Sequence, residues 1–238
     1  EYPFRCRRAE SRHRGYTERM IRGAVFDLDG VLLDSMGIWK DLGSRYLRSL
    51  GLHPEPGLDS ILFSMSMEQG AAYVKSHYSV PLREDEILTG LQKMLEDFYF
   101  NEVPAKPGAA GVLQWLSARE IPAAAATSSP REHVTRALER LGLLDKLQFI
   151  LTTGELGTSK HKPDIYELAA TRLGSAPAET LVFEDSLYAL KTAAEAHFRT
   201  VGIFDANGEP DQQALRQTAE LYLTDLRRFP EYWDALNK

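Results

Sequence analysis

Two aspartates separated by one residue, Asp27 and Asp29, form the sharpest chemical feature of the sequence. They close a short apolar run over 21–27 and are followed by a glycine, which permits a tight turn. Of two such carboxylates, one can act as a nucleophile and the other as a general acid/base. A calcium-binding loop is excluded, because its sixth and twelfth positions would be Leu32 and Ile38 instead of Gly and Glu. An aspartate that only caps a helix is the structural alternative.

Two further polar clusters could bind an anion such as phosphate. Thr127 and Ser128 stand at the end of a predicted strand, before a helix whose N-terminus offers free backbone N–H groups. Lys160 lies in a loop before another predicted helix, from which its ammonium group can neutralise a phosphate. Each cluster also has a plain structural interpretation: helix capping by Ser128 or Ser129, and a solvated lysine.

A third predicted strand ends in two adjacent acids, Glu184 and Asp185. If this strand end lies near the first, the acids of both segments repel one another unless a cation stands between them. Oxygen ligands without cysteine suit Mg²⁺, so the cluster predicts a magnesium site, with helix capping by Asp185 as the alternative. The four clusters follow in chain order at successive strand or loop ends. That coincidence favours one shared site over four unrelated structural features.

Alternating strands and helices must position these residues. Such alternation predicts an α/β fold with a parallel sheet covered on both faces, whose strands all present their carboxyl ends at one edge. We expect strands at 21–27, 121–127, 147–151, 179–184, 199–203 and 220–223, and helices at 109–119, 130–141, 163–173, 186–196 and 210–218.

A block of helical patterns at 36–50, 67–78 and 84–101 interrupts this alternation directly after the first strand. It predicts an inserted helical cap joined to the sheet by two linkers. We place the core at 20–34 and 104–238, the cap at 35–103, and a basic N-terminal extension, for which disorder is one interpretation, at 1–19.

The composition narrows the class of protein. The 238 residues are 43% hydrophobic and 26% charged, which is ordinary for a globular chain. Residues 1–19 hold six Arg and three Glu, a net +3, so 20–238 carry −9 of the total of −6. This acidic balance argues against nucleic-acid binding, and no apolar stretch is long enough to span a membrane. A single cysteine, Cys6, excludes an internal disulfide and favours the cytoplasm, while Met20 is interpreted as a natural start.

Taken together, the motifs resemble the haloacid dehalogenase-like superfamily, in particular the branch of β-phosphoglucomutase and small-molecule phosphatases with a helical C1 cap. The resemblance covers residues 20–228. It rests on Phe26-Asp27-Leu28-Asp29-Gly30-Val31-Leu32-Leu33-Asp34-Ser35, Thr127-Ser128, Lys160 and Glu184-Asp185-Ser186. It implies a Rossmann-like core with an inserted helical cap.

The resemblance also implies a role for each matched residue. Asp27 would attack phosphorus and form an aspartyl-phosphate, and Asp29 would protonate the leaving alcohol and then take a proton from water. Mg²⁺ would be held by Asp27, Asp185 and the backbone carbonyl of Asp29. Glu184 would support the metal's water shell. The transferring phosphoryl oxygens would be held by Thr127, Ser128 and Lys160. An acid at position 29 argues for phosphoryl transfer over dehalogenation, since the related dehalogenases lack it.

The sequence departs from the family pattern in two respects, which concern the identity of the site lysine and the class of substrate. The family often has Lys-Pro where this chain has Lys160-His161, and Lys162 lies nearby, so the site lysine stays open between Lys160 and Lys162. Met67 stands where the mutase branch usually has Arg, and the segment after Asp34 lacks the expected His. Both losses argue against a hexose-phosphate mutase.

We therefore predict a Mg²⁺-dependent phosphatase of a small phosphorylated metabolite, acting through an aspartyl-phosphate. A phosphosugar mutase is the first alternative and a non-catalytic phosphate-binding protein the second. The sequence identifies neither the substrate nor the oligomeric state. The histidines His53, His77 and His133 have no partner pattern and are interpreted as surface or helix residues. The cap residues that could face the substrate, with packing as the alternative, are Met36, Trp39, Lys40, Met65 and Met67.

Overall fold

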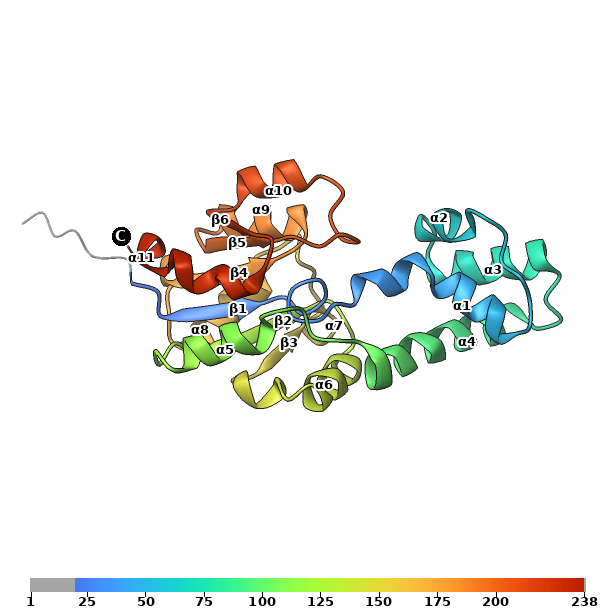
Figure 1. The fold of residues 1–238 in the computed structure, drawn as a ribbon, viewed down its shortest axis with the longest axis horizontal. Coiled ribbons are helices and arrows are strands. Elements are labelled where there is room, and N and C mark those ends of the chain that lie inside the picture. The colour runs from blue at the N-terminus through green and yellow to red at the C-terminus, as the bar shows by residue number, and fades with distance from the viewer. Residues whose placement is uncertain (1–19, 238) are drawn as a thin grey trace, which may run out of the picture.

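A computed structural model describes residues 20–237 of the protein. Its centre is a single sheet of parallel strands (Figure 1). The strand order is β3-β2-β1-β4-β5-β6, and every neighbouring pair is parallel. The predicted α/β, Rossmann-like fold class is confirmed. The extension predicted at 1–19 lies outside the described residues. The strands are β1 (Gly23–Phe26), β2 (Ala123–Thr127), β3 (Ile150–Thr152), β4 (Thr180–Glu184), β5 (Arg199–Ile203) and β6 (Leu221–Leu223).

Both faces of the sheet are covered by helices. Alternate strand residues point to opposite faces, so Ala24 and Phe26 join one apolar cluster while Val25 joins the other. Residues of α8 and α9 pack in the cluster of Val25, and residues of α5 and α6 pack in the other. The helices of this part are α5 (Ala109–Ser117), α6 (Arg131–Arg140), α7 (Thr153–Leu156), α8 (Asp164–Leu173), α9 (Leu187–Glu195), α10 (Gln212–Thr218) and α11 (Trp233–Leu236).

Between β1 and β2 the chain leaves the sheet and forms a group of helices beyond the end of β1 (Figure 1). None of the helices in residues 20–237 combines the length and apolar character that crossing a membrane requires. The boundaries predicted for core and cap stay a prediction. The helices of this group are α1 (Leu42–Ser49), α2 (Leu58–Phe63), α3 (Met67–Tyr78) and α4 (Glu84–Asp97).

Two of the predicted cap helices are irregular in the structure. The helix expected at 36–50 is a 3-10 helix, Met36–Lys40, followed by α1, with the break at Asp41. The helix expected at 84–101 is α4 followed by a π-helical turn, Phe98–Glu102. Both irregular segments lie where the chain enters or leaves the cap, and a π-helical turn is often found at a functional site.

The two linkers between sheet and cap are tied to each other. The backbone N–H of Asp34 donates to the carbonyl of Pro104 at 2.9 Å, and that of Lys106 donates to the carbonyl of Leu32 at 2.9 Å. Leu33 and Ala105 form an antiparallel bridge between these bonds. The linkers therefore run side by side, directly after the turn that holds Asp29.

Candidate active site

The strand order reverses at β1, which pairs with β2 on one side and β4 on the other. Ligands of open α/β sheets bind at such a switch point, beyond the carboxyl ends of the strands. Asp27 directly follows β1, Glu184 ends β4, and Asp185 comes next. The backbone N–H of Asp27 donates to the carbonyl of Phe183 at 2.9 Å, so the strand pairing holds Asp27 in place.

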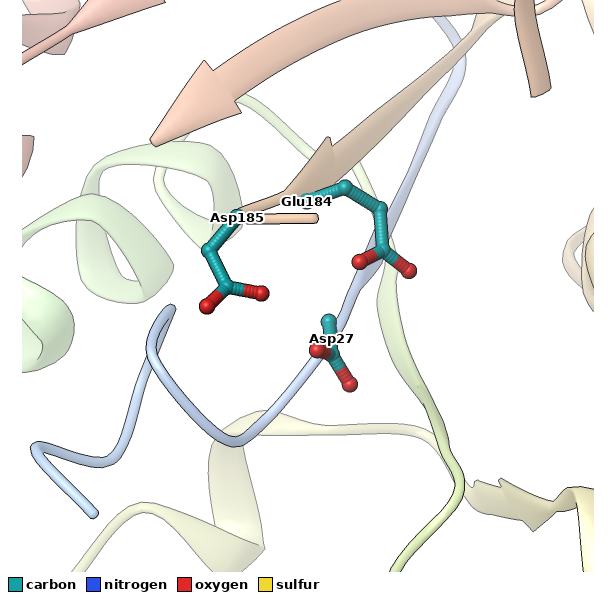
Figure 2. A group of neighbouring side chains, drawn as sticks. All are labelled: Asp27, Glu184 and Asp185. Atoms are coloured by element: carbon teal, nitrogen blue, oxygen red, sulfur yellow. The ribbon is translucent and has the colours of Figure 1, made fainter. Parts of the chain in front are cut away.

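Three buried carboxylates meet at this point. Asp27, Glu184 and Asp185 each offer a carboxylate oxygen, and these oxygens lie within 4.8 Å of one another. Figure 2 shows the three side chains converging from the ends of β1 and β4. Gly30 lies close against them, at a φ of +75°, where an added Cβ would be 2.2 Å from Oδ2 of Asp185. The turn after β1 thus requires glycine for its conformation and for its closeness to Asp185.

A buried lysine lies between two of these acids. Nζ of Lys160 is 2.6 Å from Oδ1 of Asp27 and 2.7 Å from Oε1 of Glu184. The Tyr166 hydroxyl also donates to Oε1 of Glu184, at 2.6 Å. Lys162 is exposed, so the structure brings Lys160 rather than Lys162 against Asp27.

The acids outnumber the lysine, and the pKa directions reflect this. Burial, and then the charge of Glu184, raise the pKa of Asp27 well above its ordinary value although Lys160 opposes the shift. Burial and Glu184 likewise raise the pKa of Asp185 to about 8. Burial alone would lower the pKa of Lys160, but Asp27 and Glu184 together raise it. The cluster therefore carries more negative charge than Lys160 neutralises.

The donor set fits a hard divalent cation. Oε2 of Glu184 is buried and has no hydrogen-bond partner among residues 20–237, so one acceptor of the cluster is left unsatisfied. The converging atoms are carboxylate oxygens, which Mg²⁺ prefers. Asp27, Glu184 and Asp185 can thus hold a divalent metal, in keeping with the metal use general in the family that the sequence resembles.

Asp29 has surroundings of a different kind, made of neutral hydroxyl groups. Ser35 and Tyr99 donate to its Oδ1, each at 2.6 Å, and Ser129 donates to its Oδ2 at 2.6 Å. Ser35 comes from the first linker, Tyr99 from the π-helical turn at the second, and Ser129 from the loop after β2. The carboxylate is therefore oriented by three separate segments, two of which lead into the cap.

Two of the three predicted anion-binding residues border a cavity of about 340 Å³, together with the aspartates of the site. Ser128, Ser129 and Lys160 are among its lining residues. Thr127 is fully buried beneath the loop, and its hydroxyl accepts a hydrogen bond from the backbone N–H of Ser129 at 3.0 Å. The structure thus gathers the four predicted clusters around one cavity.

The predicted cap residues fall into two groups. Met36 and Trp39 line the same cavity as the aspartates. Met65 and Met67 line a second cavity of about 370 Å³, inside the cap. Lys40 is exposed and is not among the lining residues of either cavity.

Three tyrosines of the site were missed by the sequence analysis. Tyr99 lies 70 residues after Asp29, and no periodic pattern connects them. Tyr166 lies on the sheet-facing side of α8, where an apolar pattern hides its hydroxyl. Tyr188 follows the acidic cluster and lines the same cavity as the aspartates, so its closeness to Asp185 in the sequence could have drawn attention to it.

Comparisons with known proteins add an independent line of evidence. The model of the haloacid dehalogenase-like hydrolases matches residues 21–197. Hexitol phosphatase A of Escherichia coli is 30% identical over 69% of this chain and 74% of its own length. Validoxylamine A 7'-phosphate phosphatase of Streptomyces hygroscopicus subsp. limoneus is 28% identical over 87% of this chain and 95% of its own. A Thermotoga maritima protein assigned as a beta-phosphoglucomutase has a similar fold, with a TM-score of 0.79 at 21% identity, over 91% of this chain and 98% of its own.

Proposed function

The chain belongs to the haloacid dehalogenase-like hydrolase family, and from this premise we propose that it is a Mg²⁺-dependent phosphatase of a small phosphorylated metabolite. The observation that carries the proposal is the contact of Lys160 with Asp27, beside Glu184 and Asp185, at one end of the cavity. Relatives named as phosphatases of hexitol phosphates and of validoxylamine A 7'-phosphate support it.

In the proposed reaction Asp27 is the nucleophile. A carboxylate oxygen of Asp27 attacks phosphorus, the bond from phosphorus to the ester oxygen breaks, and an aspartyl-phosphate forms. Nucleophile and substrate are both anionic, so their repulsion must be cancelled. Lys160, with Thr127 and Ser128, would hold the phosphoryl oxygens as charge develops on them.

Asp29 is the proposed general acid/base. Its protonated carboxyl gives a proton to the leaving alkoxide, and the resulting carboxylate then takes a proton from the water that attacks the aspartyl-phosphate. Phosphate leaves and Asp27 is regenerated. The hydroxyls of Ser35, Tyr99 and Ser129 can each donate or accept by rotation, so the same partners can serve both protonation states of Asp29.

Asp27, Asp185 and the backbone carbonyl of Asp29, with Glu184 behind them, are the residues proposed to hold Mg²⁺. The cation would supply positive charge that offsets the excess of carboxylates and polarises the phosphoryl group. As part of the same proposal, a reducing compartment such as the cytoplasm suits a chain with one cysteine.

The test is phosphate release from a panel of sugar, polyol and nucleoside monophosphates, measured with Mg²⁺ and with a chelator. The wild type is compared with Asp27→Asn and with a matched control, Asp34→Asn, which changes an exposed acid of the same segment. We expect release only with Mg²⁺, its loss in Asp27→Asn, and little change in Asp34→Asn. Mass spectrometry of acid-quenched protein should detect a phosphoryl group on Asp27.

Each other outcome points elsewhere. Release that survives chelation or the Asp27→Asn change would overturn the proposed mechanism. Interconversion of sugar phosphates without net release would favour the mutase. Binding of phosphate esters without turnover would favour a regulatory protein.

A further inference from the structure

Two side chains line both the cavity of the aspartates and a second cavity inside the cap. Met36 and Trp39 line the cavity that holds Asp27 and Asp29, and the same two side chains line the second cavity, inside the cap. The two spaces, about 340 and 370 Å³, therefore adjoin at this pair. A group that is attached to a phosphate at Asp27 and extends past Met36 and Trp39 would reach the cap cavity.

The wall of the cap cavity is apolar. Besides Met36 and Trp39 it consists largely of Leu42, Leu62, Met65, Met67 and Leu91, with two glycines. Two further lining residues, Asp59 and Ser66, have polar side chains.

Both polar side chains already have partners. The two carboxylate oxygens of Asp59 accept hydrogen bonds from Ser44, from its backbone N–H at 3.1 Å and from its hydroxyl at 2.5 Å. The Ser66 hydroxyl accepts from the backbone N–H of Gln69 at 3.2 Å, as the N-cap of α3. A hydroxyl-rich ligand would therefore lose its hydrogen bonds to water here and find few replacements.

A glycine of α1 lets Leu62, one wall of the cap cavity, pack close to the helix backbone. A Cβ added at Gly43 would lie 2.2 Å from Cδ1 of Leu62, and one added at Gly70 would lie 3.7 Å from Cδ2 of the same residue. Leu62 can pack close to the backbone of α1 only because position 43 has no side chain. A Cβ at Gly70 would be in ordinary van der Waals contact, so of the two glycines only Gly43 is needed for this packing.

Aromatic rings border the catalytic cavity as well. Tyr188 lines it and stacks on His161, with ring centroids 4.4 Å apart. Trp39, which lines both cavities, supplies a second ring. Aromatic side chains offer a large apolar surface, so the route from the phosphate site toward the cap is bordered by apolar area as well.

We infer that the alcohol released by this enzyme carries an apolar group, and that this group occupies the cap cavity. The inference rests on the proposed phosphatase function and specifies its substrate class. It also sets this chain apart from its hexitol phosphatase relative, because a hexitol chain would bury several hydroxyls against methionine and leucine side chains.

The experiment compares two primary alkyl esters whose leaving groups have similar chemical reactivity, 4-phenylbutyl phosphate and sorbitol 6-phosphate. We expect kcat/KM to be about 10-fold higher for the phenylbutyl ester. Met67→Gln and Met65→Gln, which make the cap cavity polar at similar volume, should each lower this ratio. The control Met94→Gln changes a partly buried methionine of α4 that is not among the residues lining either cavity, and should leave the ratio unchanged.

A binding measurement separates this inference from the phosphatase proposal. By calorimetry, the free alcohol 4-phenylbutanol should bind to the wild type and bind less to Met67→Gln, while sorbitol should not bind. Hydrolysis of both esters with a ratio below about 3-fold, or a ratio that neither cap variant lowers, would overturn the inference and leave the phosphatase proposal intact. Failure to hydrolyse either ester would count against the phosphatase proposal, and absence of 4-phenylbutanol binding against an apolar occupant.

Discussion

Asp27 and Asp29 are two residues apart in one turn, yet their surroundings are opposite in kind. Asp27 faces charges, with Lys160 at 2.6 Å and Glu184 and Asp185 close by. Asp29 faces neutral hydroxyls at 2.6 Å. The charged partners come from loops and strand ends of the sheet, whereas two of the hydroxyls come from the linkers of the cap.

This difference fits the two roles proposed for these aspartates, nucleophile and general acid/base. A nucleophile that meets an anionic substrate needs fixed positive charge, which Lys160 supplies from the loop before α8. A general acid/base must gain and lose a proton, and hydroxyls that can donate or accept suit that task. Ser35 and Tyr99 lie in the linkers of the cap, so a change in the position of the cap would act on the partners of Asp29 more directly than on those of Asp27. The following predictions test this contrast, from the largest expected effect to the smallest.

Removal of the lysine charge should have the largest effect. Lys160→Met keeps the apolar stem and leaves Asp27, Glu184 and Asp185 without their buried cation. We expect the free energy of unfolding in urea, measured with a chelator at pH 8, to fall by about 3–5 kcal/mol, because a buried ion pair is broken on one side. Phosphate release should fall by at least about 100-fold.

Lys162→Met is the matched control, since Lys162 is exposed two residues later. Its unfolding free energy should stay within about 0.5 kcal/mol of the wild type. Equal losses of unfolding free energy in Lys160→Met and Lys162→Met would show that Lys160 is not the buried cation on which the surroundings of Asp27 depend.

The two aspartates should respond to amidation with opposite signs. Burial and Glu184 raise the pKa of Asp27, so the folded state favours a neutral group there, and any stability gained from that proton is lost as the pH rises. At pH 8 in chelator, Asp27→Asn should therefore raise the unfolding free energy, by about 1 kcal/mol. Asp29→Asn weakens charge-assisted bonds from three hydroxyls and should lower it by about 1–2 kcal/mol. Urea unfolding of both, with Asp34→Asn as reference, checks the signs. Changes in the same direction would remove the basis of the comparison.

The acids of the charged half could be predicted from the sequence because they follow strands. Asp27, Glu184 and Asp185 each stand at or directly after the carboxyl end of a strand, and a parallel sheet brings such ends to one edge. The strands were predicted from apolar runs. Because the sheet is parallel, the closeness of these acids could then be predicted without knowledge of side-chain contacts.

The hydroxyl half could not be predicted in the same way. Tyr99 reaches Asp29 from the end of α4, where a π-helical turn shifts the register that a regular helix would continue. Ser35 directly precedes a 3-10 helix, Met36–Lys40, that the apolar periodicity merged with α1. Irregular turns depend on packing between distant segments, and periodicity carries no information about that packing.

Tyr99→Phe tests whether the cap linker orients the acid/base. The buried Tyr99 hydroxyl donates to Asp29, and burial together with the charge of Asp29 raises its pKa, so it stays protonated. Loss of this donor should lower kcat by about 10-fold with little change in KM, and should move the pH–rate profile to higher pH. Tyr222→Phe, which removes a tyrosine hydroxyl bonded to Gln212, is the control and should change neither. A purely structural role would lower stability without moving the profile.

The smallest effect should come from His133, which packs behind Tyr99. Their rings stack with centroids 5.4 Å apart, and Nδ1 of His133 is buried without a hydrogen-bond partner among the described residues. Burial lowers the pKa of His133, although Glu96, Glu132 and Asp29 oppose the shift. The interpretation of His133 as an ordinary helix residue therefore misses its contact with the partner of Asp29.

The sign of the pH effect follows from this lowered pKa. The unfolded chain takes up the proton near pH 6.5, while the folded protein resists it, so stability present above that pH is lost as the pH falls. The loss should be below about 1 kcal/mol, since His133 is only partly buried and solvent screens its charge. His133→Phe, which keeps a stacking ring, should flatten the fall in unfolding free energy between pH 7.5 and 5.5, measured in urea. His53→Phe changes an exposed histidine and should leave the fall as in the wild type. An equal fall in His133→Phe would show that the region behind Asp29 is not sensitive to protonation, and the contrast with the charged surroundings of Asp27 would then be sharper still.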